Sequence, residues 1–237
     1  MNFTNTILDP IKDFFFLTTC FHCGRRLSDG ESRVCANCWS SLMPVRNDDF
    51  TYQVMIKRFR EAAIIDEFIP LYYFEKIKVL QSLAHSLKYE EITSFGKELG
   101  VRIGERLKEE RIVANAVIPV PLNKRKERER GYNQSEFIAD GVSSVARVPV
   151  FPHAVRRIKY TVTQTHLNAD ERKENIADAF VIDERFREKI RDTVVIIVDD
   201  IITTGSTIQE AGKVLKDAGV KKIIASSAGL AKLGEDA

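Results

Sequence analysis

The sequence predicts an α/β domain, in which a parallel sheet is flanked by helices, preceded by a small module that contains four cysteines. Short apolar segments of strand length alternate with segments whose apolar residues recur at helical spacing, the pattern of a parallel sheet with crossover helices. All four cysteines lie between residues 20 and 38. The 237 residues, 44% of them hydrophobic, suffice for one α/β domain and an accessory module. We expect the module at residues 1–48 and the domain at residues 49–237.

Individual elements follow from the spacing of apolar residues. Runs of apolar residues, many of them β-branched or aromatic, predict strands at residues 69–74, 116–120, near 155, 180–182, 194–198 and 223–226. Apolar residues on one helical face predict helices at residues 77–87, 95–107, 133–146 and 207–218. Thr207 and Glu210 have capping-box spacing at the start of the last helix, and Gly219 stands where a C-terminal glycine cap belongs.

The segment 195–207, VIIVDDIITTGST, is the most informative for function. Its unalternating apolar run predicts a strand buried on both faces, which ends at the acidic pair Asp199 and Asp200. Small side chains, hydroxyls and backbone N–H groups then precede a helix, an arrangement that favours a bound phosphate. The predicted phosphate-binding residues are Thr203, Thr204, Gly205, Ser206 and Thr207. Carboxylates beside such a turn can accept hydrogen bonds from ribose hydroxyls, so the segment indicates a ribose 5-phosphate pocket.

This segment resembles the phosphoribosyl pyrophosphate (PRPP) signature of type I phosphoribosyltransferases. The resemblance implies a type I phosphoribosyltransferase-like fold that binds PRPP or a related sugar phosphate together with Mg²⁺. Receiver domains also end a first strand in two acids, but that pair lies near the start of the domain, whereas Asp199 lies near the end of this chain.

The four cysteines have the spacing C-x2-C-x11-C-x2-C, formed by Cys20, Cys23, Cys35 and Cys38. Two such knuckles can complete a tetrahedral Zn²⁺ site, which predicts a structural zinc ion with no open coordination position. The alternatives are two disulfides or a redox pair, for which neither a secretory signal nor a thioredoxin-like context is evident. His22 lies inside the first knuckle and is expected to be a bystander.

Two polar segments follow strands of the expected sheet. Residues 119–135 carry a cluster of basic side chains, of which Lys124, Arg125 and Arg130 are the candidates to grip a diphosphate. Residues 156–180 have a polar middle, which favours a lid loop over a plain surface excursion. Between residues 121 and 175 there are 11 Lys or Arg against 7 Asp or Glu, so positive charge concentrates beside the expected site.

Overall charge and hydropathy add little. A net charge of +2 predicts no general attraction to nucleic acid or membrane. No signal peptide and no uncharged apolar run of transmembrane length are evident, so we expect a cytoplasmic protein without an integral membrane segment.

Taken in order, the pieces resemble the ComF family of competence proteins. These pieces are the four-cysteine module, SLKY, PVPL with RGYNQS, the pattern R-x6-Q, ER-x2-N and AF, and VDDIITTGST. The resemblance places Gln164 and Arg172 in the lid loop. It also implies a role in DNA uptake during natural transformation, in contact with single-stranded DNA and with DNA-uptake proteins.

Two hypotheses follow. In the first, the chain is a phosphoribosyltransferase, in which Asp199 and Asp200 fix the ribose hydroxyls and Mg²⁺ with the basic loop neutralises the departing pyrophosphate. In the second, the same phosphate pocket and basic loops form a non-catalytic single-stranded DNA-binding module. Tyr132, Phe151 and Tyr160 are the aromatic side chains available there for base stacking.

Overall fold

The computed structural model describes residues 19–74, 89–122, 127–129, 131–158 and 179–233, without the side chains of residues 89–92. Contacts between Cα atoms divide the chain into two compact units. One is Met1–Met43 with Lys76–Ile92, and the other is Pro44–Glu75 with Thr93–Ala237. The domain boundary after residue 48 stays a prediction.

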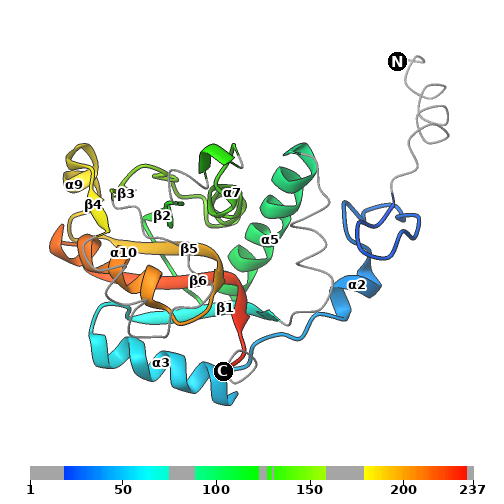
Figure 1. Cartoon of the computed structure of the whole chain (residues 1–237), viewed down its shortest axis with the longest axis horizontal. Coiled ribbons are helices and arrows are strands. Elements are labelled where there is room, and N and C mark those ends of the chain that lie inside the picture. The colour runs from blue at the N-terminus through cyan, green and yellow to red at the C-terminus, as the bar shows by residue number, and fades with distance from the viewer. Residues whose placement is uncertain (1–18, 75–88, 123–126, 130, 159–178, 234–237) are drawn as a thin grey trace. The chain divides into compact units, whose positions relative to one another are not determined.

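The larger unit is built on a four-stranded parallel sheet with the strand order β1-β6-β5-β2 (Figure 1). Its strands are β1 (Glu67–Phe74), β2 (Ala116–Pro119), β5 (Val194–Ile202) and β6 (Lys222–Ala231). In the register of the sheet, Pro119 of β2 lies opposite Val198 of β5, and Asp199 lies opposite Ser227 of β6. The carboxyl ends of β2, β5 and β6 therefore meet at one edge.

The strand β5 is buried on both faces, as its run of β-branched residues predicts. Each side chain from Val195 to Val198 is at most 1% exposed. Such burial requires cover on both faces of the sheet. Helices supply it, so the predicted parallel sheet flanked by helices is confirmed.

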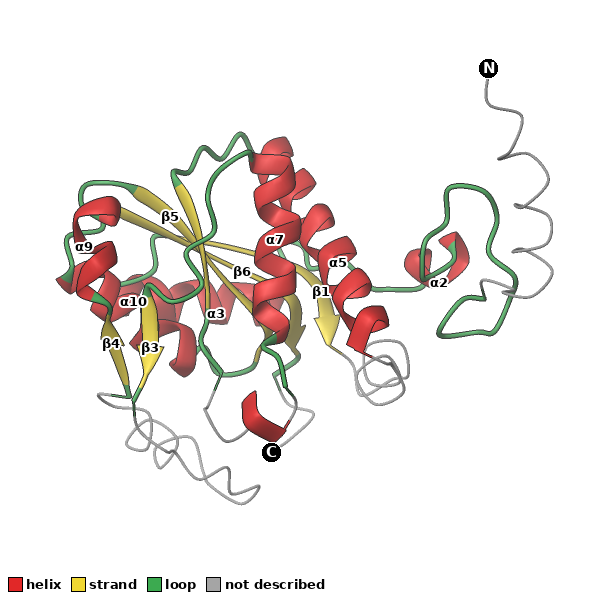
Figure 2. Cartoon of the chain, turned by 90° about the horizontal axis from the view of Figure 1, so that it is seen from above, coloured by secondary structure: helices red, strands yellow, loops and turns green. Residues whose placement is uncertain are grey.

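Helices α5 (Tyr89–Glu109) and α7 (Gln134–Ala146) cover one face, and α3 (Phe50–Ala62) and α10 (Ser206–Asp217) cover the other (Figure 2). The predicted apolar stripe of α5 is confirmed, because Phe95, Leu99, Ile103 and Leu107 are all buried. The helix expected at residues 77–87 lies outside the described residues.

The strands expected near residue 155 and at residues 180–182 exist, but they do not join the parallel sheet. β3 (Val155–Arg157) and β4 (Phe180–Ile182) form a separate antiparallel pair. The N–H of Ile158 donates to the carbonyl oxygen of Ala179 over 2.8 Å, so the pairing extends to both ends of the 159–178 segment. The expectation of a parallel sheet came from strands that alternate with helices. Antiparallel strands need no crossover helix between them, so that pattern did not distinguish β3 and β4 from the strands of the parallel sheet.

Three described helices escaped the sequence-based expectations: α2 (Ala36–Ser40), α3 and α9 (Glu184–Ile190). The first and last are short, and short helices carry little periodicity. α3 has a readable stripe, because Met55, Ile56 and Phe59 recur at helical spacing and are all buried. This apolar stripe could have predicted α3 from the sequence.

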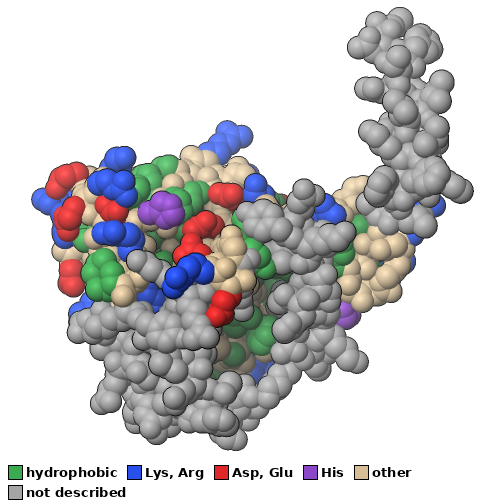
Figure 3. All heavy atoms as spheres, turned by 45° about the horizontal axis from the view of Figure 1, so that its top comes forward, with side chains coloured by type: hydrophobic (Ala, Val, Ile, Leu, Met, Phe, Trp, Pro, Cys, Tyr) green, Lys and Arg blue, Asp and Glu red, His purple; other side chains and the backbone are tan. Residues whose placement is uncertain are grey.

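No helix within the described ranges is long and apolar enough to cross a membrane. In the view of Figure 3, the coloured Lys and Arg side chains are interspersed with Asp and Glu. The described part of this face therefore presents mixed charge.

Helices α5 and α7 touch through glycines, which leads to a prediction about stability. A β-carbon on Gly100 would overlap the carbonyl oxygen of Ile138, and one on Gly141 would overlap that of Lys97. Because the obstacle is backbone, Gly100→Ala should lower the free energy of unfolding by about 1–3 kcal/mol. It should do so although alanine is the better helix former by ~1 kcal/mol. Urea denaturation measures the change.

The control for this prediction is Lys108→Ala, an exposed position on α5. It should shift the free energy of unfolding by less than about 0.5 kcal/mol. A stabilised Gly100→Ala protein would show that the two helices are not in contact at this point.

Candidate functional site

The acidic pair lies inside β5 and not after it. The strand continues through Asp199 and Asp200 to Ile202, so the expectation that it ends at Val198 is wrong. The reason is that β6 also extends, and its Gly229 and Leu230 pair with Ile201 and Ile202. The strand thus runs four residues beyond its expected end, and the two carboxyl groups stand on a part of it that pairs with its neighbour.

Asp199 is held by two hydrogen bonds to the same oxygen. The Ser135 hydroxyl donates to Oδ1 over 3.1 Å, and the backbone N–H of Asp200 donates to it over 2.9 Å. Burial, and then the charge of Asp200, raise the pKa of Asp199 well above its usual range. In the ligand-free site this carboxyl group thus favours the protonated form, and the pair carries less than two full negative charges.

Asp199 and Asp200 line a cavity of about 140 Å³ at the carboxyl edge of the sheet. The other lining residues come from the segment after β2, from the start of α7, from β3 and from the start of α10: they include Leu122, Asn133, Ser135, Arg157 and Thr207. The cavity is therefore bordered by an acid pair on one side and a helix N-terminus on another. This is the position in which open parallel sheets bind ligands.

The turn before α10 is arranged differently from the expected capping box. The N-cap residue is Gly205, with φ of 79°, and it has no side-chain cap. Instead, the Thr204 hydroxyl lies 3.0 Å from that of Ser206 and accepts the Ser206 N–H over 3.4 Å. The capping box of Thr207 and Glu210 is thus wrong, because Thr207 already lies within the helix. The positive φ of 91° at Gly219 confirms the predicted C-terminal glycine.

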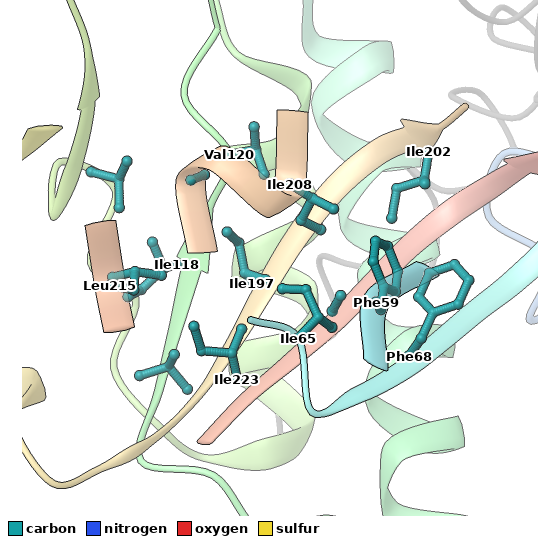
Figure 4. Close-up of a cluster of buried hydrophobic side chains, with 14 of the residues drawn as sticks. Phe59, Ile65, Phe68, Ile118, Val120, Ile197, Ile202, Ile208, Leu215 and Ile223 are labelled. Carbon is teal, nitrogen blue, oxygen red and sulfur yellow. The ribbon is translucent and has the colours of Figure 1, made fainter. Parts of the chain in front are cut away.

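Gly205 is required by packing as well as by its backbone. A β-carbon there would lie 2.7 Å from a ring carbon of Phe59 and 3.0 Å from the sulfur of Met55. Both side chains belong to α3, and Phe59 lies in the hydrophobic cluster beneath the turn together with Ile202 and Ile208 (Figure 4). Helix α3 therefore forms the floor of the turn and fixes where its N–H groups lie.

Several predicted site residues lie outside the described residues. They are Lys124, Arg125, Arg130, Gln164 and Arg172, and Tyr160 lies there too. The described residues next to these segments do reach the cavity, because Leu122 and Asn133 line it on either side of the basic segment. Arg157, just before the lid segment, lines it as well.

Of the lining residues that were not predicted, Asn133, Ser135 and Arg157 matter most for the site. Asn133 is buried, donates from its side chain to the Val120 carbonyl over 3.1 Å and accepts the Ser135 N–H over 3.2 Å, so it caps α7. Ser135 holds Asp199. Arg157 lies over the ring of Phe180, 5.4 Å from its centroid. Desolvation lowers the pKa of Arg157, and the charge of Asp199 opposes that shift.

A signal for two of them was present in the sequence. Asn133 and Ser135 begin the helix that follows the strand next to β5, and carboxyl ends of neighbouring parallel strands converge. Arg157 had no such signal, because its strand belongs to a different sheet.

The four cysteines converge into one cluster in the smaller unit. Their sulfur atoms all lie within 4.8 Å of one another. The Sγ atoms of Cys20 and Cys38 are 3.7 Å apart, as are those of Cys23 and Cys35. A metal with four sulfurs at about 2.3 Å holds them about 3.8 Å apart in a tetrahedron. These distances fit a metal and exclude disulfide bonds.

Backbone N–H groups lower the pKa of two of the thiols, Cys20 and Cys35, whereas burial raises the pKa of Cys38. Burial would raise the pKa of Cys20, but hydrogen bonds from the backbone of Cys23, Cys35 and His22 bring it down to about 6. A backbone hydrogen bond from Cys38 is the first cause that lowers the pKa of Cys35. Thiolates are the metal-binding form, so the four sulfur atoms can serve as the ligand set of a structural metal site.

The opposite pKa shifts of two acids give a pH prediction. Because the pKa of Asp199 is raised in the folded protein, ionisation of this group lowers the free energy of unfolding. The loss begins above the unfolded pKa of about 3.9 and grows with pH until the folded pKa is passed. Asp199→Asn should therefore raise the free energy of unfolding at pH 7 by about 1–3 kcal/mol. The gain should vanish below about pH 4.

The matched control is Asp183→Asn. The Arg185 side chain and N–H lower the pKa of Asp183, so its ionisation stabilises the fold above about pH 4 and loses this effect as the pH falls through the folded pKa. This variant should be destabilised at pH 7 and approach the wild type in acid. Urea denaturation at several pH values measures the free energy of unfolding of both variants. If the two variants showed the same pH dependence relative to the wild type, the opposite pKa shifts would be contradicted.

Comparison with known proteins supports the fold. The family model "Phosphoribosyl transferase domain" matches residues 135–231. "Competence protein F" of Haemophilus influenzae is 29% identical over 219 residues, which is 90% of this chain and 83% of that protein. "DNA utilization protein YhgH" of Escherichia coli K12 is 30% identical over 149 residues, 61% of this chain and 64% of that protein.

Among solved structures, the glutamine PRPP amidotransferase of B. subtilis complexed with ADP and GMP has a TM-score of 0.40 and 20% identity. The match covers 57% of this chain and 26% of that one. The phosphoribosyl transferase match contains Ser135, the acid pair and the glycine turn, and the similarity to Competence protein F extends into the cysteine module. These matches support a place for this chain in the ComF family, within the type I phosphoribosyltransferase superfamily.

Proposed function

We propose that this protein binds PRPP or a related ribose 5-phosphate ligand at the carboxyl end of β5 and acts with it in DNA uptake. The observation that carries the proposal is that Asp199, Asp200 and Thr207 line one cavity. An acid pair and a helix N-terminus facing the same space suit a ribose at one end and a phosphate at the other. The DNA-uptake part is supported by the names of the competence and DNA utilization relatives.

The acid pair would hold the ribose hydroxyls. Asp199 and Asp200 each accept a backbone N–H on one oxygen, from Asp200 and Ile201 respectively. Vicinal hydroxyls offer further donors to carboxyl oxygens, and such hydrogen bonds are strongest to ionised groups. Ligand hydroxyls would thus replace part of the solvation that Asp199 loses on burial.

The turn would hold the 5-phosphate. Backbone N–H groups from Thr203 to Thr207, with the Thr204 and Ser206 hydroxyls, precede or begin α10, whose N-terminal end attracts negative charge. The close contact of Gly205 with α3 keeps this turn in place without a ligand. A preformed turn needs no reorganisation at binding.

The diphosphate would be held by cations. We assign Lys124, Arg125 and Arg130 to it on sequence, and add Arg157, which lines the cavity beside the acids. Gln164 and Arg172 belong to the segment that we expect to close over the ligand. Mg²⁺, where bound with PRPP, supplies charge neutralisation of the diphosphate oxygens. If the protein turns over, these residues stabilise pyrophosphate as it leaves the ribose.

Two of the three aromatic side chains that strand binding could use are engaged in packing, and the third, Tyr160, lies outside the described residues. Phe151 lies 5.3 Å from Phe186, and Tyr132 lies 5.7 Å from Phe137, measured between ring centroids. We therefore favour a PRPP-type pocket over a single-stranded DNA groove at this site. A cytoplasmic location is part of the proposal, supported by the four reduced thiols of the cysteine cluster.

Calorimetry tests the pocket. PRPP with Mg²⁺ should bind the wild type, and Asp199→Ala with Asp200→Ala should weaken binding by about 10- to 100-fold, because hydrogen bonds to ionised acids are lost. The matched control is Asp140→Ala with Asp217→Ala, which removes two exposed carboxylates of the same larger unit and should bind normally. Absence of PRPP binding to the wild type would overturn the proposal.

A competition arm separates the two ligand classes. A single-stranded oligonucleotide that displaces PRPP, and whose binding weakens steeply with salt, would favour the DNA-binding alternative at this pocket. Oligonucleotide binding that leaves PRPP affinity unchanged would place DNA elsewhere.

We also propose that the metal of the cysteine cluster is zinc, because four thiolates in two knuckles are typical of structural Zn²⁺ sites. Freshly purified protein should contain about one zinc per chain by elemental analysis. Cys20→Ser with Cys38→Ser should lose the metal. His22→Ala should keep it, because the cluster consists of the four cysteines. Metal-free wild-type protein with four titratable thiols would contradict the assignment.

A further inference from the structure

Glu31 joins the two cysteine knuckles from outside the cluster. Its side chain is 15% exposed. One carboxylate oxygen accepts the N–H of Ala36, directly after Cys35, over 2.7 Å. The other accepts the N–H of Ser28 over 2.7 Å. The carboxylate thus connects the turn after the first knuckle to the first residue of α2 in the second knuckle.

Arg25 completes this connection. Its Nη2 atom donates to both oxygens of Glu31, over 2.9 Å and 3.2 Å. The residue follows Cys23 by two positions, just after Gly24, whose positive φ of 71° turns the chain. Glu31 is therefore a single anchor for the guanidinium and for both knuckles.

The backbone of Arg25 also belongs to the first knuckle, because its carbonyl oxygen accepts the N–H of Cys20 over 2.7 Å. The Arg25 side chain is 46% exposed, and Glu31, which holds it, accepts the N–H of the residue next to Cys35. Cys23 is the exposed member of the cluster, whereas the other three cysteines are buried. Arg25 is thus close in sequence to the exposed Cys23 and is tied through Glu31 to the residue after Cys35.

Charge explains why a cation belongs there. Four thiolates around a divalent metal leave a net charge of −2 in the cluster, and such a charge is costly to hold within protein unless it is compensated. A guanidinium offers several N–H donors and never loses its proton in the physiological range. Groups that hydrogen bond to metal ligands raise metal affinity without touching the metal.

We propose that Arg25 and Glu31 form an outer clamp of the metal site, in which Arg25 compensates the charge of the metal–thiolate cluster and Glu31 holds Arg25 and both knuckles in position. Both are positioning residues, and neither ligates the metal. The inference goes beyond the proposed PRPP site and does not depend on it.

Metal competition tests the clamp in the full-length, zinc-loaded protein. Zinc affinity is measured by titration with a chromogenic chelator of known affinity. Arg25→Ala and Glu31→Gln should each lower the affinity by about 10- to 100-fold, the usual effect of losing a group that supports metal ligands. Arg25→Lys keeps the charge but loses the two-oxygen contact, so its affinity should lie between those of the wild type and Arg25→Ala. The double variant should lose less than the product of the single losses, because the two residues act together.

The control is Arg46→Ala. Arg46 forms an equally simple ion pair with Asp48, on the surface of the larger unit, and its loss should leave zinc affinity unchanged. Cobalt-loaded variants give a second readout. Their sulfur-to-cobalt charge-transfer bands should stay, which would show that all four thiolates still bind and that only affinity has changed.

Two outcomes would overturn the clamp. The first is wild-type zinc affinity in both Arg25→Ala and Glu31→Gln. The second is loss of affinity in Glu31→Gln alone, which would reduce Glu31 to a fold-stabilising residue and leave Arg25 without a role.

Discussion

The turn before α10, the proposed phosphate site, depends on one close contact, that of Gly205 with Phe59 and Met55 of α3. The backbone at Gly205 is left-handed, and the space for a side chain is already filled, so no other residue can take this position without moving α3 or the turn. Because Phe59 belongs to the cluster that also contains Ile202 and Ile208, the same packing orients the end of β5 and the start of α10. A packed core thus preorganises the proposed phosphate end of the site.

The acid end is organised by hydrogen bonding at an electrostatic cost. Asp199 and Asp200 are adjacent on a strand, and burial together with their mutual repulsion favours a proton on Asp199. Ser135, at the start of α7, holds Asp199 in one orientation. In a PRPP-type site, ligand hydroxyls and cations would reduce that electrostatic cost, so the acid pair would be more stable with the ligand bound than in the empty site.

The cysteine unit is organised by a different rule. Its described part has a small buried core and depends on sulfur geometry, on N–H groups directed at the thiols and on one carboxylate that joins the two knuckles. The proposed metal would stabilise such a unit, because so short a segment buries little apolar surface. In the proposed clamp, Arg25 would also compensate the negative charge of the metal–thiolate cluster, and Glu31 would hold Arg25 in position.

Local patterns were enough to predict the parallel sheet, the stripe of α5, the metal-binding spacing of the cysteines and the acid pair beside a glycine turn, because each depends on residues close together in the chain. Tertiary structure alone decided three further features. It extended β5 through its acids, since β6 continues beside it. It placed β3 and β4 in a separate antiparallel pair, and it brought Ser135, Arg157 and α3 to the site from distant positions. Strand partners and helix contacts depend on how distant segments pack, and no spacing within one segment encodes that packing.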